Sequence, residues 1–286
     1  MKPIFPILAF LCTAALGQAA EPAKLKLHWA KNMLTISGGH LPGEEMEIHY
    51  LEAYCRDNSQ TTNWGQHTVV GHKTRLISRS NGGSEMRLHC DVNDGVTVEH
   101  VITASHDEVD FRLIAHNPTN KRSEAHWAQP CIRVGKFTGA DATADKYAYL
   151  KKSFVYLDGR RAIMPTQGWA TEARYIPRQV WAGPGVPRDD VNPRPLHPAV
   201  PSNGLIGCFS GDGSMIFATA FEPYQELFQG VIRCLHSDFR LGGLAPGETL
   251  DITGKIYLVK NDEAALLKRY HKDFPTHKAL HRPGEK

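Results

Sequence analysis

The chain has 286 residues, of which 41% are hydrophobic and 22% charged, as is ordinary for a globular protein. Its formal net charge of +3 is too near neutral to favour nucleic acid or a membrane surface as a partner. Lys2, the apolar run at residues 4–16 and the small residue Ala19 predict a signal peptide at residues 1–19, too short to span a membrane. We therefore expect a secreted or periplasmic protein, with a single domain at residues 20–275 and a tail at 276–286.

The cysteines give little indication of a metal or a disulfide framework. Cys12 lies within the predicted signal peptide. The remaining cysteines are Cys55, Cys90, Cys131, Cys208 and Cys234. Because their number is odd, at least one of them cannot be in an intramolecular disulfide. The last three lie in apolar runs and are interpreted as small buried hydrophobic residues. There is no CxxC pair and no spacing typical of zinc, so a structural zinc site is not predicted.

The first half of the chain consists of short candidate strands. Alternating or apolar runs occur at residues 25–37, 45–54, 66–78, 86–92, 97–104 and 109–116, separated by turn residues such as Asn93-Asp94-Gly95. Strands that recur about every 8–12 residues with turns between them are typical of an all-β sandwich. We therefore predict an antiparallel β-sandwich.

A long proline-rich segment at residues 158–203 interrupts this pattern. It holds eight prolines, the aromatic residues Trp169, Tyr175 and Trp181, and six arginines. So many prolines exclude long regular elements, whereas disordered segments are poor in aromatic residues. The segment is therefore predicted to be an ordered, largely irregular loop that covers one face of the sandwich.

The last part returns to strands and ends in a helix. Strands are predicted at residues 215–220, 230–236 and 248–259, the last with the cleanest alternation of apolar and polar residues. A helix is expected after Asn261, which can cap it, and it should end at Pro275. The residues beyond are predicted to fray.

Two motifs resemble galactose-mutarotase-like proteins. The first is Leu244-Ala245-Pro246-Gly247-Glu248 with the long strand that follows it, and the second is the pair His126-Trp127 on a strand. The resemblance implies a galactose-mutarotase-like supersandwich that acts on sugars, in which the histidine donates a proton to the sugar ring oxygen or orients it. Family members carry a catalytic glutamate at the strand end before the PGE loop, and here the nearest matching residue is His236.

His126, His236 and Asp238 are the candidate catalytic residues. Histidine can take and give a proton near neutral pH, and a carboxylate can orient it. We predict that the two histidines line one pocket. The alternatives are two unrelated, hydrogen-bonded histidines, or Asp189 and Asp190 as the working carboxylates.

The candidate substrate-binding residues are arginines and tryptophans. Arginine recognises carboxylate and sulfate groups through paired hydrogen bonds, and tryptophan can stack on a sugar face. The residues of this set are Trp127, Arg133, Arg178, Trp181, Arg188 and Arg233. His126, His197, His236 and Asp238 could surround a divalent ion, but no compact ligand motif indicates one, so neither a metal nor a cofactor is expected.

The sequence thus predicts a carbohydrate-active protein with histidine-based acid/base chemistry, of the epimerase or polysaccharide lyase type, acting on a sugar that is acidic or sulfated. The alternative is a non-catalytic carbohydrate-binding or cell-envelope module on the same fold, because this fold does not fix the function. The sequence specifies neither the substrate nor an oligomeric state.

Overall fold

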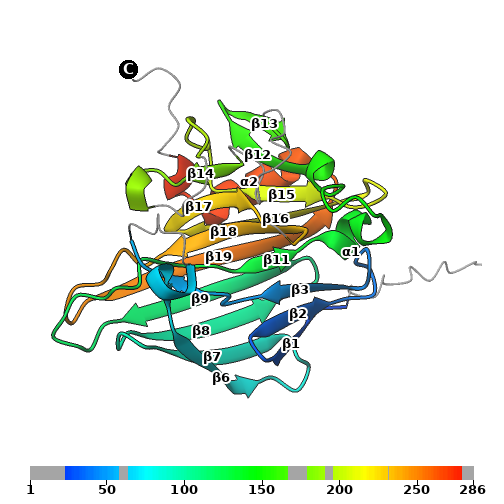
Figure 1. Cartoon of the computed structure of the whole chain (residues 1–286). Helices are drawn as coiled ribbons and strands as arrows, with labels where there is room; N and C mark the ends of the chain where they lie inside the picture. The colour runs from blue at the N-terminus through cyan, green and yellow to red at the C-terminus, as the bar shows by residue number, and fades with distance from the viewer. Residues whose placement is uncertain (1–22, 58–63, 167–178, 191–195, 231, 279–286) are drawn as a thin grey trace, which may run out of the picture.

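A computed structural model describes residues 23–57, 64–166, 179–190, 196–230 and 232–278 (Figure 1). The described strands form two sheets, and every strand pair in them is antiparallel. The predicted antiparallel sandwich is therefore confirmed. None of the helices in the described ranges is long and apolar enough to cross a membrane.

The first sheet, called sheet A, carries the N-terminal strands and the strands next to both sequence motifs. Its strands in spatial order are β1 (Lys26–Ala30), β2 (Met33–Ser37), β3 (Glu45–His49), β11 (Cys131–Arg133), β18 (Cys234–Arg240), β10 (Trp127–Ala128), β4 (Tyr54–Cys55) and β5 (Val69–Val70), while β17 (Tyr224–Gln229) pairs with β18 and with β14 (Val180–Ala182).

The second sheet, called sheet B, is built mainly from long strands. Its order is β13 (Arg160–Ile163), β12 (Ser153–Leu157), β15 (Ile206–Phe209), β16 (Met215–Glu222), β19 (Thr249–Lys260), β9 (Glu108–His116), β8 (Thr97–Ala104), β7 (Glu85–Val92) and β6 (His72–Arg79). The predicted closing strand is confirmed as β19, which pairs with β16 on one side and β9 on the other.

The helical elements are short and lie outside the sheets. They are the α-helices α1 (Gly135–Thr138) and α2 (Glu263–Asp273), the π-helical turn η1 (Trp64–Thr68), and the 3-10 turns η2 (Ala140–Ala142), η3 (Leu150–Lys152), η4 (Arg188–Asp190) and η5 (Thr276–Lys278).

Several predicted strands have different bounds in the structure, among them the one predicted at 45–54, which divides into β3 and β4. Residues 25–37 form the hairpin β1–β2, because Lys31 and Asn32 adopt positive φ and turn the chain. Residues 66–78 divide into η1, β5 and β6. The strand predicted at 230–236 begins at Cys234, which places His236 inside β18 and not at a strand end.

The main core lies between the sheets, and smaller apolar clusters cover their outer faces. Leu235 and Phe239 of β18 belong to the main core. Helix α2 packs on sheet B, where Leu266, Tyr270 and Phe274 join residues of β12 and β16. The cap of α2 is Asp262 and not Asn261, since its carboxylate accepts from the Ala265 N–H at 3.0 Å.

The C-terminal segment is ordered beyond the predicted end of the domain. His277 is buried, its ring stacks on Phe274, and its Nδ1 lies 2.5 Å from the Tyr270 hydroxyl, which accepts from the Gly204 N–H. This part of the expected tail therefore closes over the α2 face of sheet B.

The burial of His277 gives a prediction for stability against pH. Burial lowers the pKa of His277 from 6.5 to about 4. Between these values the unfolded chain binds a proton that the folded protein does not, so this contribution is complete above pH 6.5 and is lost as the pH falls. We expect it to lower the free energy of unfolding by about 2 kcal/mol between pH 7.5 and 5. Urea unfolding of wild type and His277→Gln at both pH values checks this, and equal pH dependence in the two proteins would contradict it.

Candidate functional site

The outer face of sheet A gathers polar side chains beneath the proline-rich segment. Along β18, Leu235 and Phe239 point into the core, so His236, Asp238 and Arg240 point to the opposite face. Val180 and Ala182 of the segment belong to β14, which pairs with β17 at the edge of this sheet, and with Val186 they form an apolar cluster beside Phe228. The prediction of an irregular loop over one face is therefore right only in part: the segment contributes β13 to sheet B and β14 to sheet A, while Asp190 of η4 contacts the polar face.

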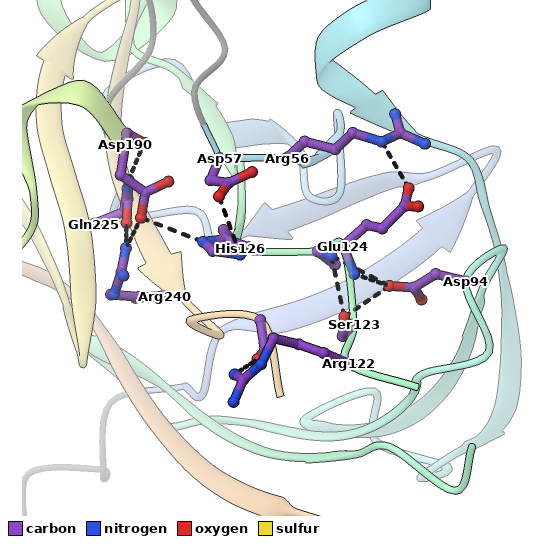
Figure 2. Close-up of polar contacts among 12 residues, drawn as sticks. Arg56, Asp57, Asp94, Arg122, Ser123, Glu124, His126, Asp190, Gln225 and Arg240 are labelled. Atoms are coloured by element: carbon purple, nitrogen blue, oxygen red, sulfur yellow. Dashed lines mark hydrogen bonds and ion pairs between the residues drawn. The ribbon is translucent and has the colours of Figure 1, made fainter. Parts of the chain in front are cut away.

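His126 lies immediately before β10 and is fixed through its backbone. Its N–H donates to the Cys55 carbonyl at 2.7 Å, and its own carbonyl accepts from the N–H groups of Leu241 and Gly242. Figure 2 shows the imidazole between two aspartates: Nδ1 is 3.3 Å from Asp190 Oδ2, and Nε2 is 3.9 Å from Asp57 Oδ2. The side chain is 17% exposed, so the ring is both held in place and accessible.

Asp190 at the end of η4 is held by two residues of sheet A. Arg240 Nη1 donates to its Oδ2 at 2.7 Å and also contacts Gln225 Oε1, while Gln225 Nε2 donates to the Asp190 carbonyl at 2.7 Å (Figure 2). Burial raises the pKa of Asp190, but the hydrogen bonds with His126 and Arg240 outweigh it, and the pKa lies below its ordinary value. Because the ionised carboxylate can only accept, His126 carries its hydrogen on Nδ1, which leaves Nε2 toward Asp57.

Residues on both sides of His126 keep its position. Asp94 Oδ2 accepts from the Ser123 hydroxyl and from the N–H groups of Glu124 and Ala125, which fixes the approach to β10. Gly243 has a φ of +67°, and a Cβ there would lie 2.4 Å from His126 Nε2. Any other residue at 243 would therefore be strained and would displace the imidazole.

His236 lies in a separate cluster farther along β18. Its ring stacks on Phe228 with centroids 3.9 Å apart, its Nδ1 is 3.3 Å from Asp238 Oδ1, and its Nε2 is 3.5 Å from Cys234 Sγ. Burial disfavours the imidazolium, but Cys234 and Asp238 together raise the pKa of His236 to about 10. A hydrogen bond with Cys131 and the charge of His236 lower the pKa of the Cys234 thiol.

The structure does not bring the two predicted catalytic histidines together. His236 is four residues from Arg240, which at the rise of a strand corresponds to about 13 Å, and it is only 3% exposed. His126 pairs with Asp190, whereas His236 pairs with Asp238.

The predicted substrate-binding residues lie at different places in the structure and do not form one site. Arg133 and Arg233 line a pocket of about 370 Å³ together with Glu47 and Asp141, and neither histidine takes part in it. Trp127 and Trp181 are fully buried, so neither presents a ring face in this structure. Arg188 donates to the His197 carbonyl at 3.2 Å, and Arg178 lies outside the described residues.

The sequence indicates only some of the residues that complete the His126 site. It offers Asp190 as an alternative carboxylate, but it does not point to Asp57 or Gln225. Arg240 has one sequence signal, because it follows His236 and Asp238 at intervals of two on the polar side of a strand.

Comparisons with known proteins found similarity only to solved structures. No protein-family model matches the chain, and no curated protein matches it. The Slr1438 protein from Synechocystis sp. PCC 6803 is 10% identical with a TM-score of 0.42, over 88% of this chain and 100% of its own.

Two further structures carry names related to sugars. A putative aldose 1-epimerase from Escherichia coli K12 is 9% identical with a TM-score of 0.42, and a galactose mutarotase-like protein from Lactobacillus casei is 10% identical with a TM-score of 0.43. Each covers 82% of this chain and 99% of its own. Both names belong to the group of proteins that the two sequence motifs resemble.

Proposed function

We propose that the protein is a carbohydrate-active enzyme that interconverts the anomers or epimers of a sugar at the His126 site. The observation that carries the proposal is the imidazole held between Asp190 and Asp57, on a sheet face partly covered by a loop. A carboxylate that fixes one ring nitrogen while the other faces an open position is the arrangement expected of a proton-transfer histidine.

The gap between His126 and Asp57 suits a substrate oxygen. Their nearest atoms are 3.9 Å apart, beyond hydrogen-bond distance, and the Asp57 side chain is 51% exposed. In the imidazolium form, with a proton on both nitrogens, His126 could donate the Nε2 proton to the ring oxygen of a sugar oriented there, while Asp57 takes the proton of the anomeric hydroxyl. The bond between the anomeric carbon and the ring oxygen then breaks, a carbonyl forms, and closure on the other face returns both protons.

A second feature supports a polar ligand at this place. Asp190 Oδ1 is buried and has no hydrogen-bond partner among the residues that the structure describes. An unsatisfied buried carboxylate oxygen costs free energy. A hydroxyl of a bound sugar could supply the missing donor.

The charges at the site favour a neutral sugar over an acidic or sulfated one. Arg240 is paired with Asp190, and Arg56 is paired with Glu124 at 2.8 Å (Figure 2). Of the four arginines expected to bind an acidic sugar, Arg133 and Arg233 line a different pocket and Arg188 donates to the His197 carbonyl, while Arg178 lies outside the described residues. We therefore place epimerisation of a neutral aldose before β-elimination of a uronic acid, which needs a free positive group for the developing charge.

We also propose that the protein works outside the cytoplasm. The support is the sequence of residues 1–19, with Lys2, an apolar run and a small-residue cleavage site. These residues lie outside the described ranges.

The test is anomer exchange measured on a panel of sugars. Single anomers of neutral aldoses and of uronic acids are dissolved with the purified protein, and exchange is followed by polarimetry and by magnetisation-transfer NMR. Faster exchange with a neutral aldose supports the proposal. Unsaturated products from a polysaccharide would support a lyase, and sugar binding without faster exchange would support the non-catalytic module; both results contradict the proposal.

A further inference from the structure

The outer face of sheet A also carries three potential metal ligands in one cluster, separate from the proposed sugar site. Cys131, Cys234 and His236 are each at most 3% exposed, and their donor atoms all lie within 4.8 Å of one another. They come from two adjacent strands: Arg133 pairs with Cys234 and Ile132 with Leu235, so the register continues to Cys131 opposite His236. The sheet, and not a local sequence motif, therefore assembles the cluster.

We propose that Cys131, Cys234 and His236 form a binding site for one Zn²⁺ ion, a site independent of the proposed sugar chemistry. Two thiolates and an imidazole are a ligand set that zinc prefers, and three protein ligands leave a fourth position for water or another ligand. Zinc–ligand bonds of about 2.0–2.3 Å in a tetrahedron place the ligand atoms about 3.3–3.8 Å apart. Cys234 Sγ and His236 Nε2 are already 3.5 Å apart.

The surroundings orient the imidazole as a ligand. His236 Nδ1 faces Asp238 Oδ1 at 3.3 Å, and the ring stacks on Phe228, so Nε2 points to the thiols. A carboxylate on the other nitrogen of a histidine ligand is the usual outer partner in zinc sites, since it fixes the ring and makes the ligand more basic.

Gly230 keeps the space beside the donor atoms open. A Cβ at this position would lie 2.2 Å from Cys234 Sγ and 2.9 Å from His236 Nε2. Any side chain there would press on two of the three proposed ligands. Within the residues that the structure describes, neither thiol of the cluster is used by a disulfide.

The experiment measures metal content and thiolate ligation in the reduced full chain. We expect about one Zn²⁺ per chain by mass spectrometry of the purified protein. Replacement by Co²⁺ should give the intense near-ultraviolet charge-transfer band of thiolate ligation in wild type. This second readout needs no variant, so it stands even if a substituted protein fails to fold.

Variants then identify the ligands. Cys131→Ser, Cys234→Ser and His236→Gln should each lose the metal, and Asp238→Asn should lower zinc affinity about 10–100-fold because it only positions His236. Cys208→Ala, a buried cysteine of β15 in sheet B, is the matched control and should keep one ion. Wild type without stoichiometric zinc, Co²⁺ binding without a thiolate band, binding of Cu⁺ but not Zn²⁺, or a Cys131–Cys234 disulfide in the native protein would each overturn the proposal.

Discussion

Replacing His126 by Gln is expected to lower the rate of sugar interconversion by about 10²–10⁴-fold, the contribution typical of a positioned acid or base. Glutamine can keep a hydrogen bond to Asp190, which lies 3.3 Å from Nδ1, but it cannot carry a proton to a sugar oxygen. The loss should therefore fall mainly on kcat and less on KM. Initial rates of anomer exchange, measured on the sugar that proves active, check this.

A matched control is available at another histidine–aspartate pair. His106 Nε2 lies 3.5 Å from Asp107 Oδ2 on the surface, and its side chain is 53% exposed. His106→Gln should leave turnover unchanged. Equal activity of His126→Gln and His106→Gln, with both proteins folded by circular dichroism, would remove His126 from the mechanism.

Much of the fold could be predicted from the sequence because its strands carry local signals. The strand predicted at 97–104 has the same bounds as β8, and the alternation at 248–259 corresponds to β19, whose two edges are both paired. The bounds that differ depend on backbone geometry at single residues. Lys31 and Asn32 both adopt positive φ. Positive φ is uncommon for lysine, so the residue type at position 31 does not predict a turn there.

The His126 site could be predicted only in part, because its second half comes from remote segments. Asp190 is 64 residues from His126, and Arg240 is 50 residues from Asp190. Asp190 lies in a proline-rich segment whose path over sheet A has no periodic signal. The sequence of such a segment therefore does not show whether an aspartate faces solvent or a histidine.

The cluster of Cys131, Cys234 and His236 cannot be recognised in the sequence for a related reason. Zinc sites are recognised in sequence by close ligand pairs, such as two cysteines separated by two residues. Here Cys131 lies about a hundred residues before Cys234 and joins it only through the pairing of β11 with β18. Apolar neighbours such as Ile132 and Leu235 make each cysteine resemble an ordinary core residue.

Replacing Arg240 by Met is expected to lower the free energy of unfolding by about 3 kcal/mol, the lower end of the range for breaking a buried ion pair. The Asp190 side chain is only 7% exposed and Arg240 is 21% exposed, so solvent compensates little for the lost guanidinium. The depressed pKa of Asp190 depends in part on Arg240. Without the arginine, the carboxylate loses its charged partner and Gln225 loses a contact. Urea unfolding at neutral pH measures the change.

Two further proteins separate this ion pair from a general effect of removing an arginine. Arg112 forms a pair with Asp110 at 2.7 Å but is 58% exposed, so Arg112→Met should cost less than about 1 kcal/mol. Adding Asp190→Asn to Arg240→Met should recover part of the loss, because the uncompensated charge is then gone. If the double variant is less stable than Arg240→Met by the full cost of Asp190→Asn alone, the two residues act independently, and Arg240 does not hold Asp190 against His126.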